Sequence, residues 1–288
     1  MNSFVIIGLG KVGSAIGYLL KQAGYSIAAV VDQSQAALHR NTAFTGGKAI
    51  TDLAALDVEA DCYIITTSDD QISHACEILS RKINTGSIVI HMSGAGGLDL
   101  LKTAKEKGAM VGSIHPLQTF SDTESAIQNL PGTIYGITVD TPLKEWSEQL
   151  VKNIGGVPFF IEESNRALYH AAACVVSNYF VSLMYMAEKI YGILGLESEK
   201  ARRAFWPLLM GTLHNIEAKG SISSLTGPIA RGDMGTLKKH LQAISANAPD
   251  LLDAYREMGI VTVEVAYRKG SLSDDEAKNI KSLLSKGV

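Results

Sequence analysis

Hydrophobic and polar positions divide the chain into two parts. From residue 1 to about 161, short apolar runs of strand length alternate with amphipathic stretches. This alternation predicts a parallel sheet covered by helices on both faces. From residue 162 the strand-like runs fade and longer runs with helical periodicity replace them. We therefore expect an α/β fold, with a doubly wound parallel sheet of the Rossmann type at 1–161 and an all-α domain at 162–288.

The first apolar run, residues 4–7, leads into a glycine-rich turn with the spacing Gly8-x-Gly10-x-x-Gly13. Gly8 permits a tight turn, Gly10 leaves room for a pyrophosphate, and Gly13 lets the next helix lie close to the strand. After that helix, a second apolar run ends in Asp32. Together these features predict a βαβ unit that binds a dinucleotide, with helix N-terminal N–H groups facing the phosphates. A glycine-rich turn in another kind of α/β protein is the alternative.

Asp32 bears on the choice of cofactor. A carboxylate there accepts hydrogen bonds from a ribose 2′-hydroxyl and repels a 2′-phosphate, which favours NAD. Polar Gln33 and Ser34, followed by Arg40 and Lys48, can instead receive that phosphate, so NADP and NAD both stay open. A helix-capping role is the structural alternative for Asp32. The residues expected to contact the cofactor are Gly8, Leu9, Gly10, Lys11, Val12, Gly13, Asp32, Gln33, Ser34, Thr66, Thr67, Ser68 and Ser93.

Further polar residues follow the apolar runs, and the carboxyl ends of parallel strands form the edge at which ligands bind. Ser93-Gly94-Ala95 can bind a carboxylate through its N–H groups and hydroxyl, unless it is an ordinary turn. His91, just before it, is equally well explained as a hydrogen-bonded strand end. His115, at a corner before a proline, can orient a substrate or exchange a proton, or can simply satisfy backbone groups.

A long helix is predicted over residues 165–192. His170, Cys174 and Asn178 recur on one of its faces at intervals of four residues. We expect His170 to donate a proton and Asn178 to orient the substrate, with a helix–helix hydrogen bond as the alternative. The helix is rich in Ala, Val, Phe and Met. It is therefore expected to be a central helix, buried by its neighbours or by a second subunit.

One connection in the helical part also carries candidate chemistry. Arg231 lies in a polar, glycine-containing segment and can clamp a carboxylate with two parallel hydrogen bonds. Asp233 can cap the helix that follows. An ion pair between Arg231 and Asp233 is the structural alternative. The residues expected to serve catalysis are Ser93, His115, His170, Asn178 and Arg231.

Composition excludes several classes of protein. The formal net charge is −3, and no basic excess suggests nucleic acid as a partner. The three cysteines lack metal-ligand spacing, so we expect no metal site and a reduced compartment. We find no apolar run of about 18 residues and therefore expect no membrane span. The chain begins without a secretory pattern, and we expect a cytoplasmic protein.

The opening unit resembles the Rossmann domain of the group that contains 6-phosphogluconate dehydrogenase, 3-hydroxyisobutyrate dehydrogenase, pyrroline-5-carboxylate reductase and ketopantoate reductase. Four further motifs are similar to those of bacterial proteins in which a Rossmann-like domain precedes an uncharacterised helical domain. These motifs span nearly the whole chain. They are His91-x-Ser93-Gly94-Ala95, His115-Pro116-Leu117-Gln118, Tyr169-His170-x-Ala172-Ala173 with Asn178, and Thr226-Gly227-Pro228-x-x-Arg231-Gly232-Asp233.

The resemblance implies a helical domain like the C-terminal one of 6-phosphogluconate dehydrogenase, and a homodimer. It also implies an oxidoreductase that transfers hydride between NAD(P) and a small 2-oxo or hydroxy acid. Some proteins of this type are regarded as ketopantoate reductases of pantothenate biosynthesis, so ketopantoate is the favoured substrate. In the wider group a lysine on the first long helix serves catalysis, with an asparagine one turn later. Here His170 and Cys174 stand in those places, with Asn178 a further turn on.

This departure keeps two alternatives open. One is an imine reductase resembling pyrroline-5-carboxylate reductase. The other is a nucleotide-responsive regulatory protein without turnover.

Overall fold

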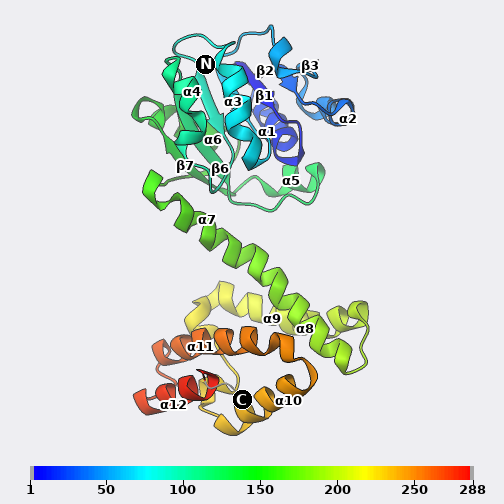
Figure 1. The fold of residues 1–288 in the computed structure, drawn as a ribbon, viewed down its shortest axis with the longest axis vertical. Coiled ribbons are helices and arrows are strands. Elements are labelled where there is room, and N and C mark those ends of the chain that lie inside the picture. The colour runs from blue at the N-terminus through cyan, green and yellow to red at the C-terminus, as the bar shows by residue number, and fades with distance from the viewer. Residues whose placement is uncertain (1–2, 286–288) are drawn as a thin grey trace. The chain divides into compact units, whose positions relative to one another are not determined.

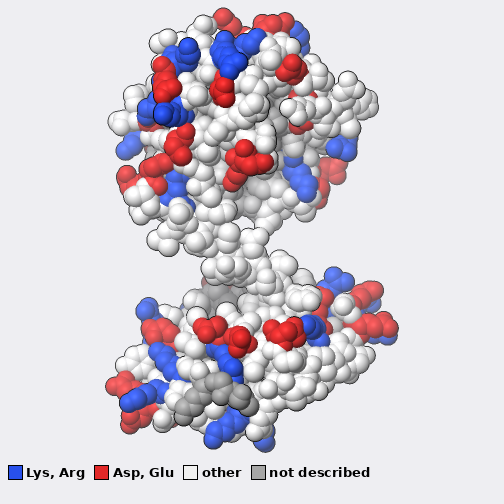
Figure 2. All heavy atoms as spheres, viewed as in Figure 1, with Lys and Arg blue, Asp and Glu red and all other residues white. Residues whose placement is uncertain are grey.

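The computed structural model describes residues 3–285 and divides into two compact units, residues 1–178 and 179–288 (Figure 1). The sequence pattern places a boundary at residue 161, directly after the last strand, whereas the compact N-terminal unit also includes the helix that follows. Figure 2 shows acidic and basic side chains interspersed over one face of the molecule. On the described surface in this view, no extended basic patch of the kind that binds a nucleic-acid backbone is present.

One eight-stranded sheet forms the centre of the N-terminal unit, with the strand order β3-β2-β1-β4-β5-β6-β7-β8. Because the order reverses beside β1, the sheet is doubly wound, and the predicted Rossmann-type fold is confirmed. The sequence pattern does not reveal β3, since two of its three residues are exposed. The strands are β1 (Ser3–Ile7), β2 (Ser26–Val31), β3 (Lys48–Ile50), β4 (Cys62–Ile65), β5 (Ile88–His91), β6 (Met110–Pro116), β7 (Ile134–Val139) and β8 (Val157–Phe160).

The sheet is not wholly parallel, because β7 runs antiparallel to β6. The connection between them explains this difference from the expected pattern. Leu117 N donates to Ile134 O at 2.9 Å, directly beyond the last residue of β6. The chain thus re-enters the sheet beside the point at which it left and must run back. His115 and Pro116 consequently lie inside β6, paired with β7, and do not form the corner expected from the sequence.

Helices cover both faces of this sheet (Figure 1). On one face, side chains such as Phe4 and Ile64 pack against α1 and α6, while α2 and α5 pack beside α1. On the other face, Val5 and Tyr63 pack against α3 and α4. Successive residues of a strand point to opposite faces, so each strand serves both layers. These helices are α1 (Lys11–Gln22), α2 (Gln35–Thr45), α3 (Ile72–Ser80), α4 (Lys102–Glu106), α5 (Thr123–Asn129) and α6 (Lys144–Asn153).

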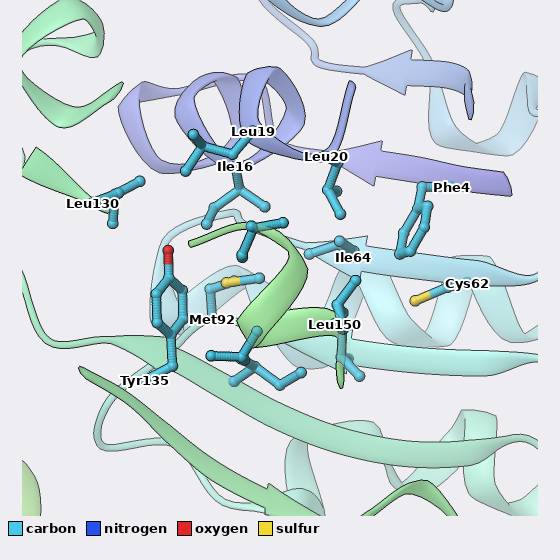
Figure 3. Close-up of a cluster of buried hydrophobic side chains, with 14 of the residues drawn as sticks. Phe4, Ile16, Leu19, Leu20, Cys62, Ile64, Met92, Leu130, Tyr135 and Leu150 are labelled. Atoms are coloured by element: carbon cyan, nitrogen blue, oxygen red, sulfur yellow. The ribbon is translucent and has the colours of Figure 1, made fainter. Parts of the chain in front are cut away.

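The core under α1 is closely packed. Figure 3 shows Ile16, Leu19 and Leu20 of α1 above Phe4 and Ile64 of the sheet. Fully burying a large apolar side chain contributes about 1.5–3 kcal/mol, so this layer holds α1 firmly against the strands. The glycine turn that joins β1 to α1 is fixed in place as a consequence.

The C-terminal unit is helical. A buried cluster that includes Leu237, Val263 and Ile280 joins α10, α11 and α12. Helix α9 contains one residue with positive φ, Gly220 at 78°, and bends there. Four more residues of α9 follow the bend. The helices of this unit are α8 (Phe180–Ile193), α9 (Ser198–Ser224), α10 (Met234–Asn247), α11 (Leu252–Arg268) and α12 (Asp274–Ser285).

The predicted long apolar helix consists of α7 (Arg166–Cys174), a π-helical turn (Val175–Tyr179) and α8. Burial by neighbouring helices of the same chain is not found, since none of its most apolar 18-residue window is buried. The stretch Glu163–Ile193, with a mean hydropathy of 1.3 in that window, is also long and apolar enough to cross a membrane by length and composition. The stretch is not an uninterrupted apolar run, because a few polar residues are spaced among Ala, Val and Met. That no segment spans a membrane stays a prediction.

Candidate active site

The glycine turn after β1 contains two closed positions and one open position. Gly8 has φ +98°, and a Cβ there would lie 2.8 Å from backbone atoms of Thr66 and Thr67. A Cβ on Gly13 would lie 2.1 Å from the carbonyl oxygen of Gly8. A Cβ on Gly10 would meet no atom within 4 Å. The first two glycines thus allow the backbone to pack, whereas Gly10 leaves space at the N-terminus of α1 for a ligand.

Asp32, at the end of β2, ties this turn together. Its Oδ2 accepts from Leu9 N at 2.7 Å, and its Oδ1 accepts from Ser34 N at 2.8 Å. The helix-capping alternative is not observed, because the side chain of Ser34 caps α2 instead. Each carboxylate oxygen keeps a second lone pair, so Asp32 can still accept a ribose hydroxyl.

A cavity of about 330 Å³ opens beside the turn. Thr67 lines it and has a buried hydroxyl with no hydrogen-bond partner among the described residues. Its lining includes the carboxylates of Asp32 and Asp52, and neither lysine nor arginine is among its described lining residues. Lys48, a predicted phosphate contact, is paired with Asp57 at 2.8 Å. The groove therefore fits the dinucleotide NAD(P), and its charge favours the form without a 2′-phosphate. The other lining residues are Ile7, Gly8, Gly10, Val31, Gln33, Leu53, Thr66, Ser68, Gln71, His74, Ala75 and Ile78.

The remaining predicted cofactor contacts lie around the same turn. Leu9 is fully buried, whereas Val12 is half-buried and Lys11 is exposed. The hydroxyl of Thr66 donates to Gly8 O at 2.5 Å and so joins the end of β4 to the turn. Ser68 precedes a short 3-10 turn, Asp69–Gln71, which leads into α3. Ser68 lines the cavity, and the adjacent Asp69 reaches the next strand end.

The turn after β5 is held by an internal hydrogen-bond network. Ser93 Oγ donates to Asp69 Oδ2 at 2.8 Å and accepts from Gly96 N at 2.8 Å. His91 Nδ1 accepts from Ser93 N at 3.1 Å, so its Nε2 carries the proton and donates to Gly97 O at 3.1 Å. His91 is thus the hydrogen-bonded strand end that the sequence left as one option. The Ser93 hydroxyl is thus engaged within the turn, and carboxylate binding at this turn stays a prediction.

Two imidazoles converge on this turn. A Cβ on Gly94 would lie 2.6 Å from His170 Nδ1 and 2.8 Å from His115 Nε2, so only glycine fits here. His115 Nδ1 lies 3.1 Å from the hydroxyl of Tyr169. His170 Nδ1 is buried and has no hydrogen-bond partner among the described residues. An unpaired buried nitrogen beside a strand end is a candidate proton donor to a ligand.

Burial keeps two of these histidines neutral. It lowers the pKa of His115 to about 4, assisted by the charges of His170 and Arg166. It also lowers the pKa of His91 to about 4, assisted by Arg166. At neutral pH, His115 is therefore a neutral hydrogen-bonding group and not a cationic acid.

These depressed pKa values predict that acid weakens the fold. Between pH 6.5 and about 4, the unfolded chain binds protons at His91 and His115 that the native state does not. The free energy of unfolding should therefore fall as the pH falls through this window, by up to roughly 3 kcal/mol per histidine. Urea unfolding at several pH values measures the slope. His91→Gln should make it shallower, and the exposed control His39→Gln should not; equal slopes in all three proteins would contradict the assignment.

Sequence reasoning overlooked two residues of this site and gave Tyr169 no role. Asp69 follows the predicted contact Ser68, and its carboxylate binds Ser93. Arg166 contributes hydrogen bonds to the same turn from the first residue of α7. Arg166 is the single charged residue between Glu163 and Glu188. A lone charge in an otherwise uncharged stretch is the sequence feature that could have identified Arg166 as a candidate site residue.

The other two predicted catalytic residues are Asn178 and Arg231. Asn178 is in the π-helical turn and is exposed. Arg231 ends a 3-10 turn in the helical unit and is exposed. No ion pair joins Arg231 to Asp233 in the described part of the chain. Asp233 instead caps α10, as predicted, by accepting from Thr236 N at 2.9 Å. Catalytic roles for Asn178 and Arg231 stay predictions.

Within residues 3–285, no group of three or more His, Cys, Asp or Glu side chains is arranged to hold a metal ion.

Two known families match successive parts of the chain. Residues 2–116 match the model of a Rossmann-like domain, and residues 133–262 match DUF2520, a domain of unknown function. The chain thus combines a Rossmann-like domain with a DUF2520 region, which confirms the resemblance seen in the sequence motifs. No match was found among curated proteins.

Solved structures share the fold over almost the whole chain. Protein TM1727 from Thermotoga maritima is 25% identical, with a TM-score of 0.75, covering 92% of this chain and 99% of that chain. Putative NADP oxidoreductase BF3122 from Bacteroides fragilis is 17% identical, with a TM-score of 0.71 and 98% of each chain covered. A 1-pyrroline-5-carboxylate reductase from Streptococcus pyogenes is 16% identical, with a TM-score of 0.61, covering 97% of this chain and 98% of that chain.

Proposed function

We propose that this chain is an NAD(P)-dependent reductase of a small 2-oxo acid, with ketopantoate (2-dehydropantoate) as the favoured substrate. One juxtaposition carries the proposal. Ser68 lines the cavity beside the glycine turn, and its neighbour Asp69 binds Ser93 in the turn on which His115 and His170 converge. A dinucleotide groove and a polar cluster with an unpaired imidazole nitrogen are therefore adjacent within one unit. The fold shared with the structures described above fits an oxidoreductase.

The proposed roles follow from the contacts. Bound NAD(P)H supplies the hydride that the carbonyl carbon accepts. The amides of Gly94 and Ala95 hold the carboxylate, and neutral His115 orients the substrate by a hydrogen bond. His170 gives its proton to the carbonyl oxygen as the C=O π bond breaks. The products are the 2-hydroxy acid and the oxidised cofactor, and His170 regains its proton from solvent.

An activity assay tests the proposal. Oxidation of NADH and NADPH is followed with ketopantoate and, separately, with pyrroline-5-carboxylate. We expect turnover with ketopantoate and none with pyrroline-5-carboxylate. The opposite result would establish the imine reductase that the Streptococcus pyogenes structure favours as the second candidate. Cofactor binding without turnover on either substrate would favour the nucleotide-responsive protein.

The same purified chain reports the cofactor preference. Because Asp32 and Asp52 line the groove without a lysine or arginine among its described lining residues, NAD should raise the melting temperature more than NADP at equal concentration. A larger shift with NADP would contradict the proposed role of Asp32.

A homodimer in the cytoplasm is the proposed state of the protein. Large apolar side chains of α8, of the turn after it and of α9 are exposed, among them Val181 at 66%, Leu194 at 72% and Leu208 at 70%. Exposed apolar surface of this kind is typical of an interface, and a second copy is the occupant that the sequence resemblance implies. Sedimentation equilibrium of the full chain checks the proposal, and a monomer at micromolar concentration would contradict it.

A further inference from the structure

Arg166 is the largest fully buried side chain of the described residues, with 2% of its surface exposed. All the acceptors that its guanidinium meets are neutral. Nε donates to Gly96 O at 2.6 Å, and Nη2 donates to Ser93 O at 2.6 Å and to Ser113 Oγ at 2.7 Å. Nη1 donates to Thr138 Oγ1 at 3.1 Å. A buried charge is expensive unless it is paired, so a cation with neutral partners alone needs an explanation.

The nearest carboxylates are engaged elsewhere. Glu163 and Asp69 act on the pKa of Arg166 through their charges. However, Glu163 Oε1 accepts from Leu98 N at 2.8 Å, and Asp69 Oδ2 accepts from Ser93 Oγ at 2.8 Å. No ion pair to Arg166 occurs within residues 3–285. Its positive charge is therefore available to an anion that arrives with the substrate.

The guanidinium also sets the direction of the turn. The carbonyl groups of Ser93, Gly94 and Gly96 are all turned toward it, the Gly94 contact being the longest at 3.4 Å. The described contacts include no acceptor for the amides of Gly94 and Ala95. Gly94 is buried against the two imidazoles, whereas Ala95 is exposed. The turn thus presents its carbonyls to Arg166 and retains two amides for a ligand.

We infer that Arg166 is the positioning residue of the substrate site: from behind the turn it orients the Gly94 and Ala95 amides and supplies the positive charge that complements the substrate's carboxylate. This inference rests on the proposed function, because it takes the turn to be the site of the acid. The substrate does not touch Arg166. The cation acts through the backbone of the turn, whose peptide dipoles point from the guanidinium to the anion.

Anion binding tests the inference directly. Oxalate serves as the probe, and its Kd is measured by titration calorimetry on the full chain saturated with NAD. Arg166→Gln should weaken oxalate binding at least tenfold while the Kd of NAD stays within twofold. Arg166→Lys, which keeps the charge, should bind oxalate within threefold of the unmodified protein. The control is Arg81→Gln, a 69% exposed arginine paired with Glu77, which should change neither constant.

The charge-specific pattern separates this role from a purely structural one. If Arg166→Gln binds oxalate within twofold of the unmodified protein, or if Arg166→Lys is as weak as Arg166→Gln, the inference is overturned. If Arg166→Gln does not melt cooperatively, the oxalate affinity of Arg166→Lys decides whether the inference stands. Retained oxalate affinity supports the inference, and lost oxalate affinity with normal NAD affinity overturns it.

Failure of the inference and failure of the proposed function give different results. If the protein reduces 2-oxo acids and Arg166→Gln leaves KM unchanged, the proposed function stands and the inference fails. If the protein binds oxalate through Arg166 but reduces no 2-oxo acid, the inference stands and the proposed function fails. If it neither binds oxalate nor reduces such acids, both fail.

Discussion

Replacing His170 with alanine is expected to lower kcat for the 2-oxo acid by 100-fold to 10,000-fold, because general acids typically contribute about that much. His170 Nδ1 is buried beside Gly94 and has no partner among the described residues, so its loss breaks no internal hydrogen bond at that atom. The Kd of NAD should stay within about twofold, since His170 is not among the residues that line the cofactor cavity. Steady-state kinetics with ketopantoate, together with cofactor titration, measure both effects.

Two further variants show whether the effect is specific. His115→Ala should cost less in kcat, because the depressed pKa of His115 keeps it neutral and restricts it to hydrogen bonding. His39→Ala, at an exposed position of α2, should leave kcat unchanged. A loss below tenfold in His170→Ala, with cofactor binding intact, would reject the proton-donor role.

Replacing Gly13 with alanine is expected to lower stability, whereas replacing Gly10 with alanine is expected to leave stability unchanged. The new methyl group of Gly13→Ala would lie 2.1 Å from Gly8 O and 2.5 Å from Thr66 Oγ1. Overpacking of this kind costs about 1–3 kcal/mol or more, so the melting temperature should fall and NAD affinity should fall with it. Gly10→Ala meets no atom within 4 Å and should melt as the unmodified protein does. Its methyl group occupies the approach path of the pyrophosphate, so NAD affinity should drop at least tenfold.

The matched control is Gly211→Ala in α9, where the methyl group also meets nothing within 4 Å and the site lies outside the groove. It should leave NAD affinity unchanged and add about 1 kcal/mol of helix propensity at most. Calorimetry of melting and NAD titration of all three variants provide the comparison. Normal NAD affinity in Gly10→Ala would remove the main support for a dinucleotide at this turn.

Local patterns were enough to locate the cofactor groove because its parts are close in sequence. Gly8, Gly10 and Gly13 lie within six residues of one another, and Asp32 follows after one helix and one strand. Each requirement, a positive φ, an open approach and a close helix, is met by one residue type at a fixed spacing. The residues around Ser93 were harder to interpret, since a short polar turn is compatible with many roles. The pattern identified the turn, but it did not show that the serine hydroxyl was already engaged by Asp69.

By itself, the sequence determined the doubly wound α/β fold, the helical second part, the glycine turn and the candidate histidines, since periodicity and short-range spacing encode these features. Only the tertiary structure decided which distant groups meet. It placed Arg166 against the carbonyls of Ser93 and Gly96, about seventy residues away in the chain, and left His170 Nδ1 unpaired beside Gly94. It also showed that β7 runs antiparallel to β6 and that the long apolar helix is exposed within this chain. Such outcomes depend on packing between remote segments, which no local pattern specifies.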